Sequence, residues 1–323
     1  MNNFSGKEEI IRSLRPVVSD FKFVAVNDKV LDEFCSRIRP KHIPHPDWNA
    51  PVIYGGLDET GIDYFLVMNS INFCFWGDPK WTVEYRGRSY DGAFGMFAAL
   101  TRALEEGHPI YDGAYLAKLS KTDLAHILRG NVPIPLLEPR LGILRDIGRG
   151  LAGRWGGRFS RMVAEVGGSA VALVGLLTEQ FPSFNDSVPW GEGRLIFHKR
   201  AQLAPAMINE RWRGKGIGAF RDIDRLTVSA DYKLPQVLRR TGILEYVPSL
   251  AQRIDENRRI PANSREEIEI RAATIMAGEM MREKIARTIP SITSQDVDRF
   301  LWLVGQTKTG NEKPYHKTLT TAY

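Results

Sequence analysis

The chain has 323 residues, of which 43% are hydrophobic and 25% charged, with a formal net charge of +6 at pH 7. This is ordinary globular composition, and no stretch reaches the roughly eighteen apolar residues that a membrane span needs. The lysines and arginines form no long run, so the positive charge suits an anionic small molecule about as well as RNA. Cys35 and Cys74 have no metal-ligand spacing, and residues 1–30 lack the apolar block of a secretory signal. We therefore expect a cytoplasmic protein without a membrane partner.

The N-terminal part of the sequence predicts two helices followed by a small sheet. In residues 1–40, apolar side chains such as Ile10 and Leu14 recur at helical spacing. Residues 41–51 contain three prolines, which indicates a loop. Residues 64–68, 72–76 and 81–85 are short aromatic or β-branched runs separated by turn residues. That pattern is typical of an antiparallel meander, here placed at about residues 52–86.

The rest of the chain has mainly helical periodicity. Capping patterns begin two of the helices, with Ser120 before Asp123 and Ser264 before Glu267. The predicted helices cover residues 121–129, 136–151, 159–166, 169–181, 194–212 and 265–288. No segment has the composition of a flexible linker. We therefore expect residues 1–323 to form a single α-rich domain, either undivided or with two lobes around a cleft.

A glycine-rich turn precedes an acidic residue at the start of a helix. Residues 214–218 (GKGIG) lie between two predicted helices, and Asp231 follows just before Pro235. Exposed backbone N–H groups at such a turn can hold a phosphate, although a plain helix–helix turn is the commoner meaning. Because Lys215 is followed by Gly216, the turn is not a P-loop.

The order of glycine turn and aspartate is similar to that of the helix–hairpin–helix DNA glycosylases. A fixed carboxylate suits cleavage of a glycosidic C–N bond, because the sugar develops positive charge as the base leaves. The same carboxylate can deprotonate an attacking water molecule. The alternative is that Asp231 only caps the helix that follows, a position that aspartate favours.

Six blocks along the chain resemble the queuosine salvage protein family, whose members are queuosine 5′-phosphate N-glycosylases/hydrolases. The blocks are residues 72–76 (NFCFW), 197–202 (FHKRAQ), 226–236 (LTVSADYKLPQ), 264–271 (SREEIEIR), 298–302 (DRFLW) and 314–317 (PYHK). The resemblance implies a mainly α, DNA-glycosylase-like fold and a catalytic role for Asp231. Ser229 departs from the family pattern, because an aromatic residue usually stands there and would stack on the base.

Other residues in these blocks are candidates for binding the substrate. Phe73 could stack on queuine, a 7-deazaguanine, or could simply belong to the core. Asp298 and Trp302 are one helical turn apart and share a face, so Asp298 could accept hydrogen bonds from the base. Lys199 is the first candidate for the 5′-phosphate, with His316 as a second. The alternative is an exposed helix carboxylate for Asp298 and a surface charge for Lys199 and His316.

The expected reaction is hydrolysis of queuosine 5′-phosphate to queuine and ribose 5-phosphate. No histidine or cysteine spacing indicates a metal, and no nucleotide-cofactor fingerprint is present, so neither a metal nor a cofactor is expected. Glu267 and Arg271 are interpreted as a surface pair on a helix. Two alternatives stay open: a base glycosylase acting on a nucleic-acid polymer, and a non-catalytic nucleotide- or tRNA-binding module. The scattered charge predicts no stable nucleic-acid partner.

Overall fold

The computed structural model describes residues 4–43, 48, 50–307, 310 and 312–323. It is mainly helical with small antiparallel sheets, which confirms the expected fold class. The α-helices are α1 (Lys7–Val18), α2 (Asp28–Ser36), α3 (Glu59–Ser70), α4 (Gly92–Glu105), α5 (Gly113–Lys118), α6 (Lys121–Ile127), α7 (Leu137–Arg154), α8 (Phe159–Glu165), α9 (Ala170–Gln180), α10 (Lys199–Arg211), α11 (Lys233–Arg240), α12 (Pro248–Asp255), α13 (Arg265–Ile285) and α14 (Ser294–Gln306). The strands are β1 (Val24–Val26), β2 (Thr82–Tyr85), β3 (Arg88–Asp91), β4 (Ser187–Trp190), β5 (Gly193–Ile196) and β6 (Leu244–Tyr246).

Most of the predicted helices are confirmed, and their capping residues act as expected. Ser120 accepts a hydrogen bond from the main-chain N–H of Asp123 at 3.0 Å at the start of α6. Ser264 does the same for Glu267 at 3.4 Å at the start of α13. These bonds satisfy N–H groups that have no partner inside the helix. Of the predicted loop at 41–51, residues 44–47 and 49 lie outside the described residues, and η1 (Pro40–His42) is a 3₁₀ turn.

The prediction of β-strands at residues 64–68 and 72–76 is wrong. Residues 64–68 belong to α3, which is buried on all sides from Gly61 to Ser70, so its sequence carries no amphipathic period. Residues 72–76 are irregular, and β2 pairs with β3 in a two-stranded hairpin. The backbone at 72–76 finds distant partners instead of a neighbouring strand. Arg140 binds the carbonyls of Phe73 and Cys74, and the N–H of Cys74 donates to the carbonyl of Tyr323 at 2.9 Å.

The predicted helix at 194–212 begins later than expected. Residues 193–196 form β5, which pairs antiparallel with β4 so that Trp190 faces Gly193 across the turn. His198 has a left-handed backbone (φ 48°) that separates the strand from α10. Strands β1 and β6, which are far apart in the sequence, form a third pair with Val24 opposite Tyr246. Helical periodicity did not reveal these short strands because each has only three or four residues.

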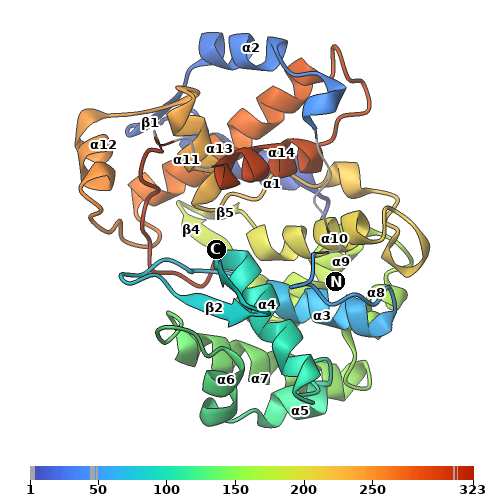
Figure 1. The fold of residues 1–323 in the computed structure, drawn as a ribbon. Coiled ribbons are helices and arrows are strands. Elements are labelled where there is room, and N and C mark those ends of the chain that lie inside the picture. Colours follow the sequence, from blue (N-terminus) through green and yellow to red (C-terminus); the bar gives the residue numbers. More distant parts are fainter. Residues whose placement is uncertain (1–3, 44–47, 49, 308–309, 311) are drawn as a thin grey trace.

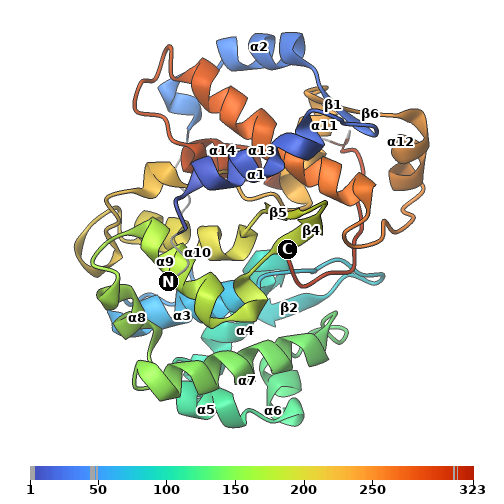
Figure 2. The same cartoon turned by 180° about the vertical axis from the view of Figure 1, so that it is seen from behind.

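The hydrophobic core consists of two clusters. One is built from residues between 52 and 226, and the other from residues 10–38, 188–197 and 228–301. In Figure 1, helices α5, α6 and α7 lie at the opposite end of the molecule from α2, with α10 and strand β5 between these ends. Figure 2 shows the same arrangement from behind, with α7 lying across α5 and α6. The expectation of one domain, with or without two lobes, stays a prediction.

Within the described residues, no helix has both the length and the apolar character that crossing a bilayer requires.

Candidate active site

A cavity of about 480 Å³ is lined by residues from both hydrophobic clusters. Its walls are rich in aromatic side chains, which suits a flat heterocyclic ligand. Six of the seven predicted site residues line it: Phe73, Lys199, Ser229, Asp231, Asp298 and Trp302. They come from the segment after α3, from α10, from the segment before α11 and from α14. Folding therefore brings together residues that span more than two hundred positions of the sequence.

The segment that carries Asp231, residues 226–231, is held by side chains from three helices. The main-chain N–H of Thr227 donates to Gln202 of α10 at 2.9 Å. The main-chain N–H of Ser229 donates to a carboxylate oxygen of Asp298 of α14. Arg271 of α13 donates from Nε to the carbonyl of Ala230 at 3.2 Å. Because the residues that precede it are bonded to three helices, Asp231 is held at the cavity on a rigid support.

Asp231 caps α11 and also lines the cavity. Its Oδ1 accepts hydrogen bonds from the N–H groups of Lys233 at 2.7 Å and Leu234 at 3.0 Å. Within the described residues, Oδ2 receives no such bond. The side chain is half-buried. The capping role and the cavity-facing role are therefore compatible, because each uses a different oxygen of the same carboxylate.

Lys199 places a buried ammonium group at the cavity. The residue is 5% exposed and stands at the start of α10, where its main-chain N–H donates to Asp186. No described residue forms a hydrogen bond or ion pair with its Nζ. Burial lowers the pKa of Lys199, and the negative charge of Asp231 opposes this shift. A buried cation without a bonded anion is costly, so this position favours a ligand that carries negative charge.

Asp298 is a buried carboxyl group close to Asp231. Its exposed fraction is 7%. Burial raises the pKa of Asp298 to about 7, the bond from the N–H of Ser229 opposes this shift, and the charge of Asp231 adds to it. The two carboxyl groups therefore differ in their surroundings. Asp231 is half-buried and accepts hydrogen bonds from two main-chain N–H groups, while Asp298 is buried. Such differences can separate an acid from a base at one site.

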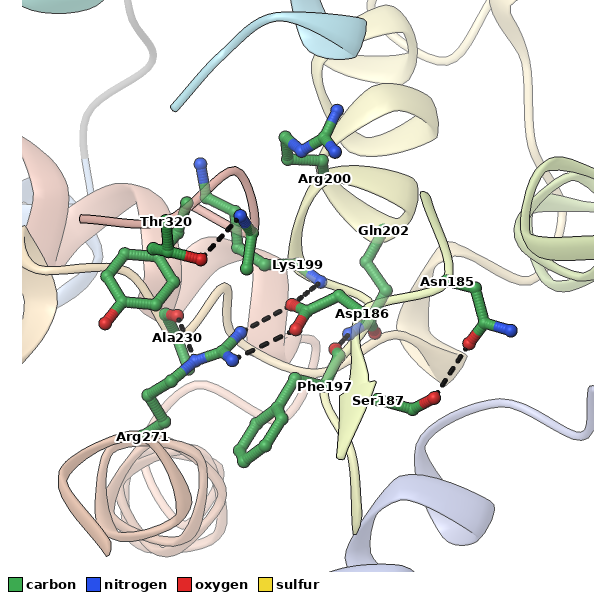
Figure 3. A network of polar contacts seen from close by, with 12 residues as sticks. Asn185, Asp186, Ser187, Phe197, Lys199, Arg200, Gln202, Ala230, Arg271 and Thr320 are labelled. Carbon is green, nitrogen blue, oxygen red and sulfur yellow. Dashed lines mark hydrogen bonds and ion pairs between the residues drawn. The ribbon is translucent and has the colours of Figure 1, made fainter. Parts of the chain in front are cut away.

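An ion pair that the sequence did not reveal supports both Lys199 and Asp231. Arg271 binds both carboxylate oxygens of Asp186, with Nη1 at 3.0 Å from Oδ1, and Asp186 Oδ2 accepts the N–H of Lys199 at 3.2 Å (Figure 3). Although burial acts to raise the pKa of Asp186, the guanidinium of Arg271 lowers it below the ordinary value. Glu267 is also buried, with its Oε1 3.7 Å from Nη1 of Arg271. The interpretation of Glu267 and Arg271 as a surface pair is therefore wrong.

Phe73 lies in the cavity wall with two guanidinium groups close to its ring. The guanidinium carbon of Arg140 lies 4.2 Å from the ring centre, and that of Arg200 lies 5.2 Å away. Phe73 is 1% exposed, so it belongs to the core and to the cavity wall at once. Trp302 is half-buried, and its ring lies 5.7 Å from that of Phe94, which also lines the cavity. Trp302 is thus the more accessible aromatic wall.

His316 is not among the residues that line the cavity. It lies behind Tyr323, which does line it, and its Nε2 is 3.1 Å from the Tyr323 hydroxyl. Burial lowers the pKa of His316 to about 3, so the ring is uncharged at neutral pH. This placement does not support the expected contact between His316 and a phosphate.

The glycine turn at 214–218 does not form an anion-binding loop in the structure. The N–H groups of Gly214 and Gly218 donate to the carbonyls of Asn209 and Lys215 at 2.8 and 3.3 Å. Gly218 packs so closely on Trp212 that an added Cβ would lie 2.5 Å from that side chain. The turn therefore serves the packing of the chain around Trp212.

One group of potential metal ligands occurs in the described residues, and it lies outside the cavity. Ligand atoms of Glu106, His108 and His126 lie within 4.8 Å of one another. Arg129 binds two of these residues, with its Nη1 at 3.0 Å from Glu106 Oε2 and 3.1 Å from His126 Nε2. His108 instead lies 2.9 Å from the Tyr115 hydroxyl, so each of the three residues already has a hydrogen-bond partner.

Comparison with known proteins identifies the family. A model of the queuosine salvage protein family matches residues 54–323. The chain is 40% identical over 314 residues to a protein of Sphaerobacter thermophilus, covering 97% of each chain. It is 34% identical over 278 residues to a protein of Bos taurus, covering 81% of this chain and 82% of the other. It is 31% identical over 260 residues to one of Schizosaccharomyces pombe, covering 76% and 75%. All three are named queuosine 5′-phosphate N-glycosylase/hydrolase. The chain therefore belongs to the queuosine salvage protein family.

Proposed function

We propose that this protein is an N-glycosidase that hydrolyses queuosine 5′-phosphate to queuine and ribose 5-phosphate, and so recovers queuine for tRNA modification. The observation that carries the proposal is the placement of Asp231, a rigidly held carboxylate with one free oxygen at an aromatic-walled cavity. The names of the relatives supply the substrate. The substrate is a small molecule, and the proposal includes no stable nucleic-acid partner.

In this mechanism Asp231 acts on the ribose. As the C1′–N9 bond breaks, the sugar acquires positive charge that the carboxylate stabilises. Its free Oδ2 accepts a proton from the water molecule that attacks C1′. The two N–H groups on Oδ1 hold the carboxylate in place, so little reorganisation accompanies the reaction.

The remaining assignments follow the lining of the cavity. The base lies between Trp302 and Phe73, with the small side chain of Ser229 in the cavity wall beside Asp298. Asp298 binds the base through hydrogen bonds. Lys199 binds the 5′-phosphate, which supplies the anion that its buried ammonium lacks in the described residues.

The two cysteines are buried free thiols. They are compatible with the reducing cytoplasm, where we place the reaction.

The test is release of queuine from queuosine 5′-phosphate by the wild-type protein and by Asp231→Asn. An asparagine keeps an oxygen for the N–H groups of Lys233 and Leu234, so the helix cap and the fold are retained. We expect release by the wild type and a loss of at least about 100-fold in kcat for the variant.

Asp224→Asn is the matched control, because Asp224 lies seven positions earlier, is exposed and does not line the cavity. It should keep wild-type activity. Absence of release by the wild type would reject the proposed function. Equal release by wild type and Asp231→Asn would move the catalytic role to another residue.

A further inference from the structure

The leaving group sets a chemical problem that Asp231 alone does not solve. Purine bases leave more easily when a ring nitrogen is protonated, and N7 is a common site for this. Queuine is a 7-deazaguanine, so N7 is replaced by carbon. The ring nitrogen that keeps an in-plane lone pair in the nucleoside is N3, which lies next to the glycosidic N9. An acid for this base must therefore stand on the ribose side of the ring.

Asp298 is bonded to the segment that carries Asp231, the residue proposed to act on the ribose. Its Oδ2 accepts the N–H of Ser229, two positions before Asp231 in the same segment. The charges of Asp231 and Lys199 both act on it. A carboxyl group that served only the far edge of the base would lie away from the groups that surround the ribose and the phosphate. The hydroxyl of Ser229 also acts on this carboxyl group, and Asp298 lines the cavity.

We propose that Asp298 is the general acid of the reaction and delivers a proton to N3 of the leaving base. This inference rests on the proposed function and extends the role of Asp298 from binding to catalysis. A neutral carboxyl group fits the N3 edge of the base well. Its O–H donates to N3, while its other oxygen accepts a hydrogen bond from the exocyclic amine next to N3.

The groups around Asp298 favour its neutral form. Burial and the negative charge of Asp231, on the segment before α11, both favour protonation. The N–H and the hydroxyl of Ser229, and the ammonium of Lys199 on α10, oppose it. The net result raises the pKa of Asp298 to about 7, so a substantial fraction carries a proton at neutral pH. As pH rises through about 7, Asp298 loses this proton and can no longer act as a general acid.

The proposed step balances. The C1′–N9 bond breaks with its electron pair on the base, and the proton of Asp298 Oδ1 moves to N3. Water adds to C1′ and gives its proton to Asp231. The products are queuine, as the N3–H tautomer that solvent converts to the N9–H form, and ribose 5-phosphate. Solvent then returns the proton from Asp231 to Asp298, and no oxidant or reductant takes part.

The test compares two substrates that differ in their need for an acid. Queuosine 5′-phosphate has the deazapurine leaving group, and 4-nitrophenyl riboside 5-phosphate has one that departs as a stable anion without being protonated. Asp298→Asn should lose about 100-fold or more in kcat on the nucleotide. On the nitrophenyl riboside it should stay within about threefold of the wild type, because no acid is needed there. Asp231→Asn should be inactive on both.

The pH profile gives a second measurement on the same proteins. For the wild type, kcat/KM on queuosine 5′-phosphate should fall as pH rises through about 7, and Asp298→Asn should lack this descending limb. Both substrates carry a phosphate, so a limb due to the phosphate would appear with both. If the wild type does not hydrolyse the nitrophenyl riboside, the pH dependence of kcat/KM on queuosine 5′-phosphate tests the inference by itself.

Three results would overturn the inference while leaving the proposed function intact. These are wild-type turnover of the nucleotide by Asp298→Asn, an equal loss on both substrates, or a descending limb that persists in the variant. An unchanged melting curve serves as the folding control for Asp298→Asn. Absence of queuine release by the wild type would instead reject the proposed function itself.

Discussion

Arg271 and Asp186 form a buried ion pair that joins the two sides of the candidate active site. The side chains are 1% and 6% exposed, and the residues are 85 positions apart in the sequence. Arg271 also holds the carbonyl of Ala230, next to Asp231, while Asp186 holds the N–H of Lys199 (Figure 3). The guanidinium lies 3.9 Å from the ring centre of Phe197, which restricts its position further. One pair of charges thereby supports both Asp231, the proposed catalytic carboxylate, and Lys199, the proposed phosphate ligand.

Asp186→Asn should reduce both stability and turnover. The change leaves the Arg271 guanidinium buried without its bidentate partner, which typically lowers the free energy of unfolding by about 3–5 kcal/mol. Turnover should fall because Lys199 and Asp231 lose a common support. Urea unfolding and queuine release measure the two effects. Asp146→Asn is the control, because its pair with Arg149 is exposed and should be worth less than about 1 kcal/mol. Equal stability of the two variants would contradict this account.

Lys199→Met should weaken binding of the phosphate while stabilising the fold. Methionine keeps much of the length of the side chain without its charge, so the cost of burying an unpaired ammonium is removed. We expect inhibition by ribose 5-phosphate to weaken about tenfold or more, because hydrogen bonds to charged groups contribute about 1.5–3 kcal/mol. Inhibition by queuine should change by less than about twofold. Lys215→Met, at an exposed position outside the cavity, should change neither constant. An equal loss for both inhibitors would argue against phosphate binding by Lys199.

Trp302→Leu should weaken binding of the base. Stacking on an aromatic side chain contributes about 1–3 kcal/mol per base, so the Kd for queuine should rise about tenfold. Titration of queuine by fluorescence or calorimetry measures this change. Trp190→Leu provides a matched control, because Trp190 lies outside the cavity and packs near Arg265. If both variants bind queuine like the wild type, the base does not stack on Trp302.

The stability of the protein should fall as pH decreases from about 6.5 towards 4. Burial lowers the pKa of His198 to about 4 and that of His316 to about 3, so the folded state holds both rings neutral while the unfolded state protonates them. Each such histidine lowers the free energy of unfolding by about 1.4 kcal/mol per pH unit below 6.5. Between pH 7 and pH 5, His316→Gln should therefore lose about 2 kcal/mol less than the wild type in urea unfolding. Equal losses would show that His316 is protonated in the folded protein.

Local features of the sequence predicted a large part of the helical structure. The helix α13 was predicted from the cap at Ser264 and from its apolar spacing, because both signals depend on residues within one or two turns. The cap at Asp231 was equally visible, since its hydrogen bonds reach only two and three positions along the chain. By contrast, α3 was mistaken for a strand because it is buried on all sides and so lacks an amphipathic pattern.

The sequence by itself determined the family, the mainly helical class and the candidate role of Asp231, because short motifs and local periodicity carry that information. The tertiary structure decided which distant residues share the cavity and what surrounds them. It brought Asp186 to Arg271, enclosed Asp298 beside Asp231, and placed His316 behind Tyr323. No local pattern predicts these outcomes. They depend on which charged groups are buried together, and burial is a property of the packed chain and not of any single segment.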